Sequence, residues 1–231
     1  MKFALLDNKR VEPCPQTSAT CPCCGNEVVS KCGAIKVWHW AHRSKKHCDH
    51  WWENETDWHR NWKNCFPAEW QEVVHYADDG EKHVADIKTS SGFVMEFQHS
   101  AISQEERISR ENFYNKMCWV IDGTRLKSDL IKFNRAPTLR NLKYPTLMYE
   151  RVPVNFFPSL QKWYLSEKTV FFDFGDKLFC ILPTSHRASG MLMFSLSQDK
   201  FAEIVSIYGD RSIDFEQIIR SEEDFNFLKI S

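Results

Sequence analysis

The residues with the clearest capacity for chemistry are cysteines and histidines near the N-terminus. Six of the nine cysteines fall within the first 48 positions, and the run Cys21-Pro-Cys-Cys24-Gly25 holds a pair separated by two residues. In a cytosolic chain such a pair indicates a metal site rather than a disulfide. Two thiolates, joined by further thiolate or imidazole ligands at this spacing, suit tetrahedral zinc.

Five donors compete for the four places in this zinc site: Cys21, Cys24, His39, His42 and Cys48. We favour Cys21, Cys24, His42 and Cys48, with His39 as the reserve, because a strand through His39 would direct its ring away from the ion. Four protein ligands leave no open position, so the zinc is expected to be structural. Two alternatives are cysteines packed as small hydrophobes and a catalytic thiol, Cys21 or Cys24, paired with His39; the spacing favours zinc.

A second group of polar residues interrupts apolar strands in the middle of the chain. Asp86 falls in a strand expected at 83–87, while Glu96 and Gln98 fall in a strand expected at 93–98. Glu96 and Gln98 share a face because side chains alternate along a strand. A carboxylate in an apolar strand is costly unless it is paired. If the two strands pair across the turn at 90–92, Asp86 and Glu96 come within reach of one Mg²⁺ ion.

Such a site predicts hydrolysis of phosphodiester bonds. A bound magnesium ion would activate water and stabilise the charge that develops on the phosphate. Glu55, on a helix expected at 54–64, is the acid that would complete the ion shell or orient the water. Glu55, His59 and Lys63 recur at steps of four and lie on one stripe of that helix. The alternative for this stripe is a solvated face of ion pairs.

The next helix offers contacts to a phosphate backbone. It is expected from Ser103, which forms a capping box with Glu106, to about residue 116. The net charge of the chain is −1, yet residues 107–151 hold ten Lys and Arg against four Asp and Glu. A basic segment of this kind can hold phosphates. Arg107, Arg110 and Tyr114 lie at steps of three and four along this helix and form one stripe. Together with His59 and Lys63 of the preceding helix, they are the residues expected to bind nucleic acid.

The elements that must position these groups follow from the hydrophobic periodicity of the sequence. The N-terminal segment predicts a hairpin with arms at 26–31 and 34–38. It is followed by a helix, three strands, a helix and a strand, expected at 54–64, 72–76, 83–87, 93–98, 103–116 and 117–121. The fold class is therefore α+β, with a mixed central sheet flanked by helices in αβββαβ order and a small N-terminal zinc-binding β module.

In this order the motifs resemble the PD-(D/E)XK nuclease core, which is of the α/β type, and more narrowly the competence protein CoiA-like family. The resemblance covers about residues 20–123 and implies DNA as the substrate and Mg²⁺ or Mn²⁺ as the catalytic cofactor. The matching motifs are Cys-Pro-x-Cys-Gly at 21–25, His-Trp-Ala-His at 39–42, Glu-x-x-x-His at 55–59, His-x-Ala-Asp at 83–86, Glu-Phe-Gln-x-Ser at 96–100, Arg-x-x-x-Tyr at 110–114 and Trp-Val-Ile-Asp-Gly at 119–123.

The resemblance also implies roles for single residues. Asp86 and Glu96 become the metal ligands and Glu55 the helix-borne acid. Gln98 stands where the superfamily usually has lysine, although the CoiA-like branch also has glutamine there. A neutral amide can position water or phosphate but supplies no positive charge. One hypothesis is that Lys63 or Arg110 supplies it.

The sequence divides into four segments: a zinc-binding β-hairpin module at 1–50, a PD-(D/E)XK-like nuclease core at 51–123, a basic connector at 124–152 and a C-terminal α+β extension at 153–231. The connector predicts a short helix near 126–133. The extension predicts strands at 169–174, 178–182 and 191–194 and a helix at 198–207.

Together these features predict a Mg²⁺-dependent deoxyribonuclease with a structural zinc module. The alternative is a catalytically weak or inactive zinc-containing DNA-binding protein in DNA uptake, recombination or phage defence. The sequence has no run of about 18 apolar residues and no signal peptide, so we expect a cytoplasmic protein without membrane contact. It leaves open whether RNA is also a substrate and whether the chain forms homo-oligomers or binds a protein partner.

Overall fold

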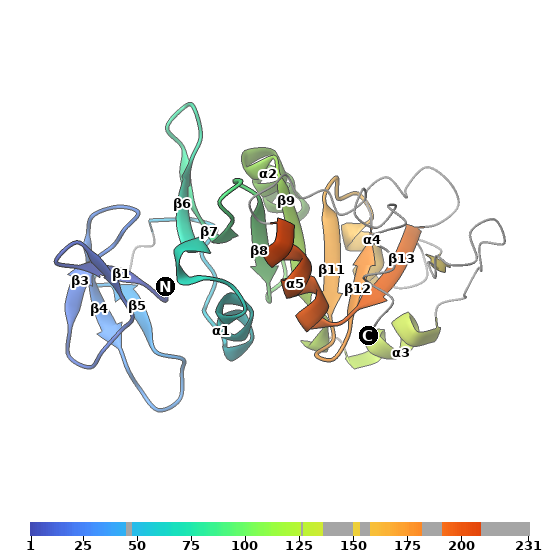
Figure 1. Cartoon of the computed structure of the whole chain (residues 1–231), viewed down its shortest axis with the longest axis horizontal. Helices are drawn as coiled ribbons and strands as arrows, with labels where there is room; N and C mark the ends of the chain where they lie inside the picture. The colour runs from blue at the N-terminus through green and yellow to red at the C-terminus, as the bar shows by residue number, and fades with distance from the viewer. Residues whose placement is uncertain (45–47, 126, 136–149, 153–157, 182–190, 209–231) are drawn as a thin grey trace. The chain divides into compact units, whose positions relative to one another are not determined.

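A computed structural model describes residues 1–44, 48–125, 127–135, 150–152, 158–181 and 191–208 (Figure 1). The chain divides into two compact units, Met1–Lys88 and Thr89–Ser231, and each is described by itself. Helices and strands are both present in the order of a mixed fold, so the predicted α+β class is confirmed. No described helix is long and apolar enough to cross a membrane.

The first unit begins with a five-stranded antiparallel sheet in the order β2-β1-β3-β4-β5. Its strands are β1 (Ala4–Leu6), β2 (Lys9–Val11), β3 (Ser18–Thr20), β4 (Glu27–Lys31) and β5 (His39–His42). The predicted first arm of the hairpin is β4, but the second arm expected at 34–38 is wrong, because β5 begins only at His39. The connection is a wider loop, in which the Trp38 indole donates to the Gly33 carbonyl at 3.1 Å.

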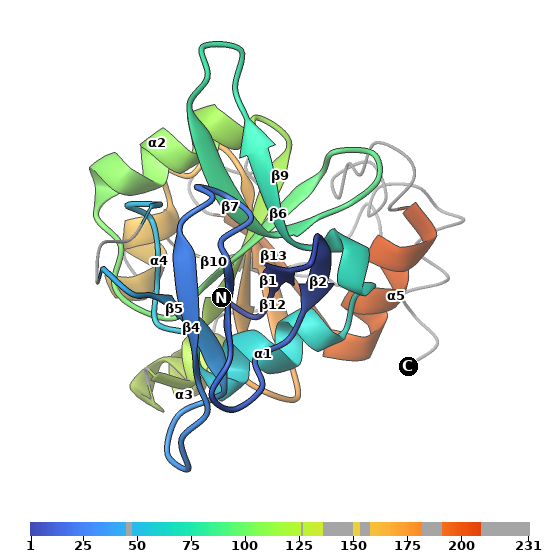
Figure 2. The same cartoon turned by 90° about the vertical axis from the view of Figure 1, so that its left-hand side faces the viewer.

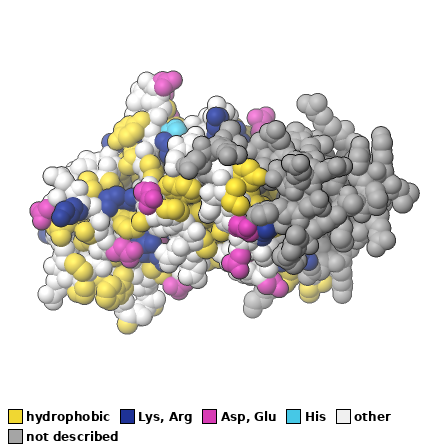
Figure 3. All heavy atoms as spheres, in the orientation of Figure 1, with side chains coloured by type: hydrophobic (Ala, Val, Ile, Leu, Met, Phe, Trp, Pro, Cys, Tyr) yellow, Lys and Arg dark blue, Asp and Glu magenta, His cyan; other side chains and the backbone are white. Residues whose placement is uncertain are grey.

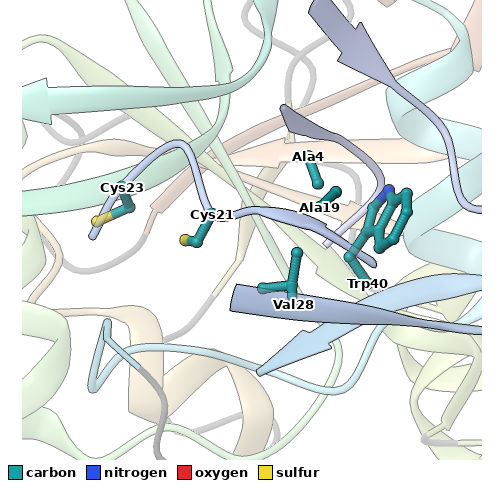
Figure 4. Close-up of a cluster of buried hydrophobic side chains, with 6 residues drawn as sticks. All are labelled: Ala4, Ala19, Cys21, Cys23, Val28 and Trp40. Atoms are coloured by element: carbon teal, nitrogen blue, oxygen red, sulfur yellow. The ribbon is translucent and has the colours of Figure 1, made fainter. Parts of the chain in front are cut away.

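Small and aromatic residues form the core of this sheet (Figure 4). The cluster consists of Ala4, Ala19, Cys21, Cys23, Val28 and Trp40. The Trp40 indole N–H donates to the Val11 carbonyl at 3.1 Å, which satisfies its buried donor. Cys21 lies directly after β3, so the packing of this small core fixes the start of the turn that carries the predicted zinc ligands.

The first unit continues with α1 (Asp57–Asn64), the 3₁₀ helix η1 (Ala68–Trp70), β6 (Gln71–Tyr76) and β7 (Lys82–Lys88). Helix α1 begins at Asp57 rather than 54, because the Thr56 hydroxyl caps it by accepting from the His59 N–H at 3.3 Å. Glu55 therefore precedes the helix. Strands β6 and β7 pair antiparallel. Along β7 buried and half-buried residues alternate, and Asp86 is on the half-buried face.

In the second unit six strands form one mixed sheet in the order β10-β13-β12-β11-β9-β8. Strands β8, β9 and β11 are parallel, and the remaining pairs are antiparallel. The elements are β8 (Val94–Gln98), α2 (Gln104–Tyr114), β9 (Met117–Asp122), η2 (Gly123–Arg125), α3 (Lys127–Arg135), β10 (Glu150–Val152), α4 (Pro158–Trp163), β11 (Thr169–Asp173), β12 (Leu178–Ile181), β13 (Met191–Leu196) and α5 (Gln198–Tyr208). The strands and helices predicted here are confirmed within a few residues at their ends.

Helices cover both faces of this sheet. In two perpendicular views α2 and α4 lie on one face and α5 lies on the other (Figures 1 and 2). Every residue of β8, β9, β11 and β12 is buried, as expected for strands covered on both sides. The Ser103 hydroxyl caps α2 by accepting from the Glu106 N–H at 3.1 Å, as predicted. Polar residues within these strands therefore lie away from bulk water.

Candidate functional site

The structure brings the four favoured zinc donors together. Cys21 and Cys24 lie on the turn between β3 and β4, His42 ends β5, and Cys48 follows further along the chain. One ligand atom from each of these residues lies within 4.8 Å of the other three. His39 begins β5 and its ring Nδ1 lies 2.8 Å from the Val37 carbonyl oxygen. This Cys₃His cluster can bind a structural zinc ion.

The spacing within the Cys₃His cluster fits tetrahedral coordination. The sulfur atoms of Cys21 and Cys48 are 3.8 Å apart. The Cys24 sulfur lies 3.3 Å from His42 Nε2. Zinc–sulfur bonds of about 2.3 Å at a tetrahedral angle place two sulfurs about 3.8 Å apart. The turn is closed by Gly25, which has a φ of +74° and donates from its N–H to the Cys21 carbonyl at 2.9 Å.

The three thiols differ in acidity. Burial raises the pKa of Cys21. Burial and the neighbouring Cys21 and Cys23 raise the pKa of Cys48 much further. For Cys24 burial is outweighed by hydrogen bonds from Asn26 and the neighbouring thiols, so the pKa of Cys24 is lowered. A cation bound at this point favours the thiolate form of all three.

A second cluster in the first unit is built around the ammonium group of Lys63. Its Nζ lies 3.5 Å from Glu55 Oε1, 2.9 Å from Glu72 Oε1 and 3.1 Å from Asp86 Oδ1. The side chains of Lys63, Glu55 and Glu72 are about equally buried, at 5–6% exposure, whereas Asp86 is 21% exposed. Asp86 is therefore the acid of this group that a ligand can reach from solvent.

The charges of this Lys63 cluster reinforce one another. Burial acts to lower the pKa of Lys63, but the attraction of its three carboxylates outweighs burial and raises the pKa well above its usual range. Burial likewise acts to raise the pKa of Glu72, but Lys63, the chain's amino terminus and backbone N–H donors hold it well below its usual range. Lys63 is thus a cation and Glu72 an anion at neutral pH.

Sequence reasoning did not identify Glu72 as a site residue. It accepts from the Lys2 N–H at 2.7 Å and the Phe3 N–H at 3.0 Å. Its φ of +47° is unusual for a residue in a strand. A glutamate at the start of an apolar strand is the same kind of signal that drew attention to Glu96, so it was available. Nothing in the sequence indicates that the backbone N–H groups of Lys2 and Phe3 would be its partners.

In the second unit the predicted residues Glu96 and Gln98 lie in the buried strand β8. Glu96 is 4% exposed, and its Oε2 lies 3.0 Å from Arg110 Nη1. Arg110 also contacts Glu106 on its own helix. Gln98 is 3% exposed and donates from Nε2 to the Ser100 carbonyl at 3.1 Å. Glu96 and Arg110 thus form a buried ion pair, which offsets the free energy lost when a carboxylate is removed from water into an apolar strand.

The residues predicted to contact nucleic acid are buried, at 2–5% exposure: His59, Lys63, Arg107, Arg110 and Tyr114. His59 lies 3.2 Å from Glu53 and 2.9 Å from the Thr56 hydroxyl. On the face shown in Figure 3, exposed Lys and Arg side chains are interspersed with Asp and Glu. Contact of these five residues with nucleic acid stays a prediction.

Another buried pair was missed because its members are far apart in the sequence. His83 Nδ1 lies 2.8 Å from Asp49 Oδ1, and His83 Nε2 lies 3.0 Å from Glu81. The His83 ring stacks on Trp51 with 3.3 Å between ring centroids. The second Asp49 oxygen accepts from the Val84 N–H at 2.8 Å. This network ties Asp49, which directly follows the predicted zinc ligand Cys48, to strand β7.

Asp86 belongs to the first unit and Glu96 to the second. Within the first unit the structure brings Glu55 and Asp86 to one ammonium group, and within the second it brings Glu96 to Arg110. The prediction that Asp86 and Glu96 share one metal ion stays a prediction.

One comparison with known proteins gives a match. The family model for the N-terminal domain of competence protein CoiA matches residues 6–50. This segment contains all four residues of the Cys₃His cluster, so the match supports a CoiA-like family for the zinc module. No curated protein and no solved structure matches the chain. The predicted nuclease core lies beyond the matched residues.

Proposed function

We propose that this chain is a competence-related, zinc-containing nuclease that hydrolyses DNA phosphodiester bonds with Mg²⁺ or Mn²⁺. The zinc module is supported by the CoiA match at residues 6–50 and by the Cys₃His cluster within it. The proposed active-site residues are Glu55, Asp86, Glu96 and Gln98.

The observation that carries the proposal is the meeting of Glu55 and Asp86 at Lys63. Two acids chosen from different sequence motifs contact the same ammonium group, at 3.5 and 3.1 Å. Lys63 and Arg110 are the two cations that could supply the charge absent at Gln98. The distance of Lys63 from Asp86 supports that role, because a lysine beside a metal-binding carboxylate can also stabilise a phosphate.

Each residue of the proposed active site has a distinct role. Asp86 and Glu96 would hold the metal ion, which when bound supplies Lewis acidity and lowers the pKa of a water molecule. Lys63 contacts the carboxylates of Glu55 and Asp86 and fixes their orientation. Arg110 does the same for Glu96. The Gln98 amide orients the attacking water or the phosphate by hydrogen bonding.

A second function is favoured by the same ion pairs. Lys63 and Arg110 already neutralise Asp86 and Glu96 without a metal ion. Gln98 adds no positive charge. A protein of this kind could bind DNA through a nuclease-like fold and cleave it slowly or not at all. The alternative is therefore a zinc-containing DNA-binding protein.

Plasmid nicking separates the two functions. The wild-type chain should nick supercoiled DNA when Mg²⁺ or Mn²⁺ is added, and should not do so when these ions are omitted. Asp86→Asn and Glu96→Gln keep the size of each side chain, and each should lower the rate at least a hundredfold, by analogy with the loss of one charge-stabilising group. Asp79→Asn, in the exposed turn after β6, is the matched control and should be fully active.

Circular dichroism of each variant shows whether its fold is intact. DNA binding without cleavage by the wild type, in both metals, would favour the DNA-binding function. Full activity of folded Asp86→Asn would show that the proposed metal ligand is wrong. Chelators are avoided in this assay, because they would also remove zinc from the Cys₃His cluster.

A further inference from the structure

The second unit has a cavity of about 460 Å³ at the carboxyl ends of its parallel strands. Its lining includes Gln98 at the end of β8, Asp122 at the end of β9 and Phe172 near the end of β11. Parallel sheets with helical connections commonly bind ligands at this edge. The volume is within the range of about 300–1,000 Å³ that small-molecule sites occupy.

The first turn of α2 also borders this cavity, through Ser103, Gln104 and Arg107. The helix has eleven residues, Gln104–Tyr114, and directly follows β8 in the chain. The N–H groups of a helix start and the helix dipole favour an anion there. A helix start alone would not identify a site, but a buried arginine points to the same place.

Arg107 is 2% exposed and lines the cavity. Its Nη1 lies 2.8 Å from Glu111 Oε1. Among the described residues its Nε and Nη2 have no hydrogen-bond partner. Glu111 is itself held by the Trp119 indole at 3.1 Å and the Ser166 hydroxyl at 2.7 Å. Glu111 therefore fixes one edge of the guanidinium and leaves two donors for a ligand.

The remaining charges of the lining favour an anion. Arg107, Arg125 and Lys162 oppose a single acid, Asp122, among the described residues that line the cavity. Asp122 is already engaged, since Oδ2 lies 2.6 Å from His99 Nδ1 and Oδ1 accepts from the Thr124 N–H at 2.9 Å. With Glu111, which pairs with Arg107, three cations face two acids, so the cations are in excess by one.

We propose that this cavity binds a phosphate monoester, with Arg107 as the buried anchor and Arg125 and Lys162 at its rim. A guanidinium with two adjacent free N–H donors matches two oxygens of one phosphate group. The apolar wall of Ile121, Trp163 and Phe172 leaves room for a sugar or base. The phosphate can come from the end of a DNA strand or from a free nucleotide.

Binding to the full chain tests this site without added Mg²⁺ or Mn²⁺, so the result is independent of nuclease activity. The probes are thymidine 5′-monophosphate, thymidine, and one short single-stranded oligonucleotide with either a 5′-phosphate or a 5′-hydroxyl. Each phosphorylated probe should bind at least tenfold more tightly than its unphosphorylated partner. Tighter binding of the phosphorylated oligonucleotide than of the nucleotide identifies a strand end; equal or weaker binding identifies the free nucleotide.

Variants locate the binding in the cavity. Arg107→Leu should abolish the preference for phosphate, but it also leaves Glu111 buried without its arginine. The exposed rim therefore provides the second test, and Arg125→Ala combined with Lys162→Ala should weaken phosphate binding about tenfold. Lys200→Ala, on α5 across the sheet (Figure 2), is the control and should bind as the wild type does. Equal binding with and without the phosphate, or wild-type binding by the rim variant, would overturn the proposal.

Discussion

The first unit contains two clusters of side chains that can hold a cation, and the clusters differ in where that cation comes from. In the Lys63 cluster the carboxylates of Glu55, Glu72 and Asp86 surround an ammonium group of the chain itself. The Cys₃His cluster consists of donors alone. The first cluster contains a cation of its own, whereas the second can bind a cation from solution.

Because of this difference, only the stability contributed by the Cys₃His cluster should depend on a bound ligand. A cation that belongs to the chain is present at every metal concentration, so the Lys63 cluster should be insensitive to zinc. Arg107 in the second unit differs from both clusters. It is a buried cation whose Nε and Nη2 have no hydrogen-bond partner among the described residues. The Cys₃His cluster can take up a metal ion, and the guanidinium of Arg107 can donate to an anion. The Lys63 cluster instead holds its acids in place through a cation of the chain.

Loss of zinc should have the largest effect on the first unit. His42→Ala removes one of four ligands and should reduce bound zinc well below one ion per chain. Because structural zinc contributes on the order of 10 kcal/mol to the folding of small zinc modules, the thermal midpoint should fall sharply. Zinc content by elemental analysis and melting by circular dichroism measure both effects.

His39→Ala is the matched control for this experiment, since His39 lies on the same strand and its ring contacts a backbone carbonyl. It should retain zinc and melt close to the wild type. A wild-type chain that folds equally well without zinc would contradict the assignment of the Cys₃His cluster as a structural site.

Replacement of Lys63 should have the next largest effect, and it should not depend on zinc. Lys63→Met leaves the buried carboxylates of Glu55 and Glu72 and the partly exposed carboxylate of Asp86 without their shared cation. It should lower the free energy of unfolding by about 3–5 kcal/mol. Urea denaturation with excess zinc measures this loss. Lys132→Met removes a more exposed lysine, whose side chain is 38% exposed and lies 3.6 Å from Asp129, and should cost less than about 1 kcal/mol. Equal effects of the two substitutions would show that Lys63 does not organise the acids.

Much of this arrangement could be predicted from local sequence. The C-x2-C pair, His42 and Cys48 were predicted to form one cluster because their residue types and spacing are typical of a metal site, and the structure brings them together. The strands and helices of the second unit followed from runs of apolar residues and from the Ser103 cap. Sequence patterns were sufficient where a motif or an apolar run marks the residues, even though Cys21 and Cys48 are 27 residues apart.

The Lys63 cluster could be predicted only in part, because no sequence motif marks its members as one group. Glu55 and Lys63 belong to one predicted helical stripe, but the helix begins after Glu55 and the two residues still meet. No local pattern shows that Glu72 accepts from the N–H groups of Lys2 and Phe3, or that Asp49 holds His83. Such pairs depend on how separate elements pack, which single-residue preferences do not specify.

The smallest expected effect is the loss of stability when Glu72 in the Lys63 cluster is protonated at low pH. The pKa of Glu72 is held far below that of an unfolded glutamate, about 4.3. A lowered folded-state pKa contributes stability that is complete above the unfolded pKa and is lost as the pH falls below it. Glu72→Gln keeps an acceptor for the Lys2 and Phe3 N–H groups but removes the charge, so it should be destabilised at pH 7.

The difference between wild type and Glu72→Gln should therefore shrink on acidification, by about 1.4 kcal/mol for each pH unit below about 4.3. Urea denaturation at pH 7, 4 and 3 measures it, and protonation of the zinc ligands affects both proteins alike. Glu69→Gln, at an exposed position of η1, should show no such trend. A constant gap between wild type and Glu72→Gln across this range would mean that the Lys63 cluster does not hold Glu72 ionised, and that its carboxylates are less tightly satisfied than their distances from Lys63 indicate.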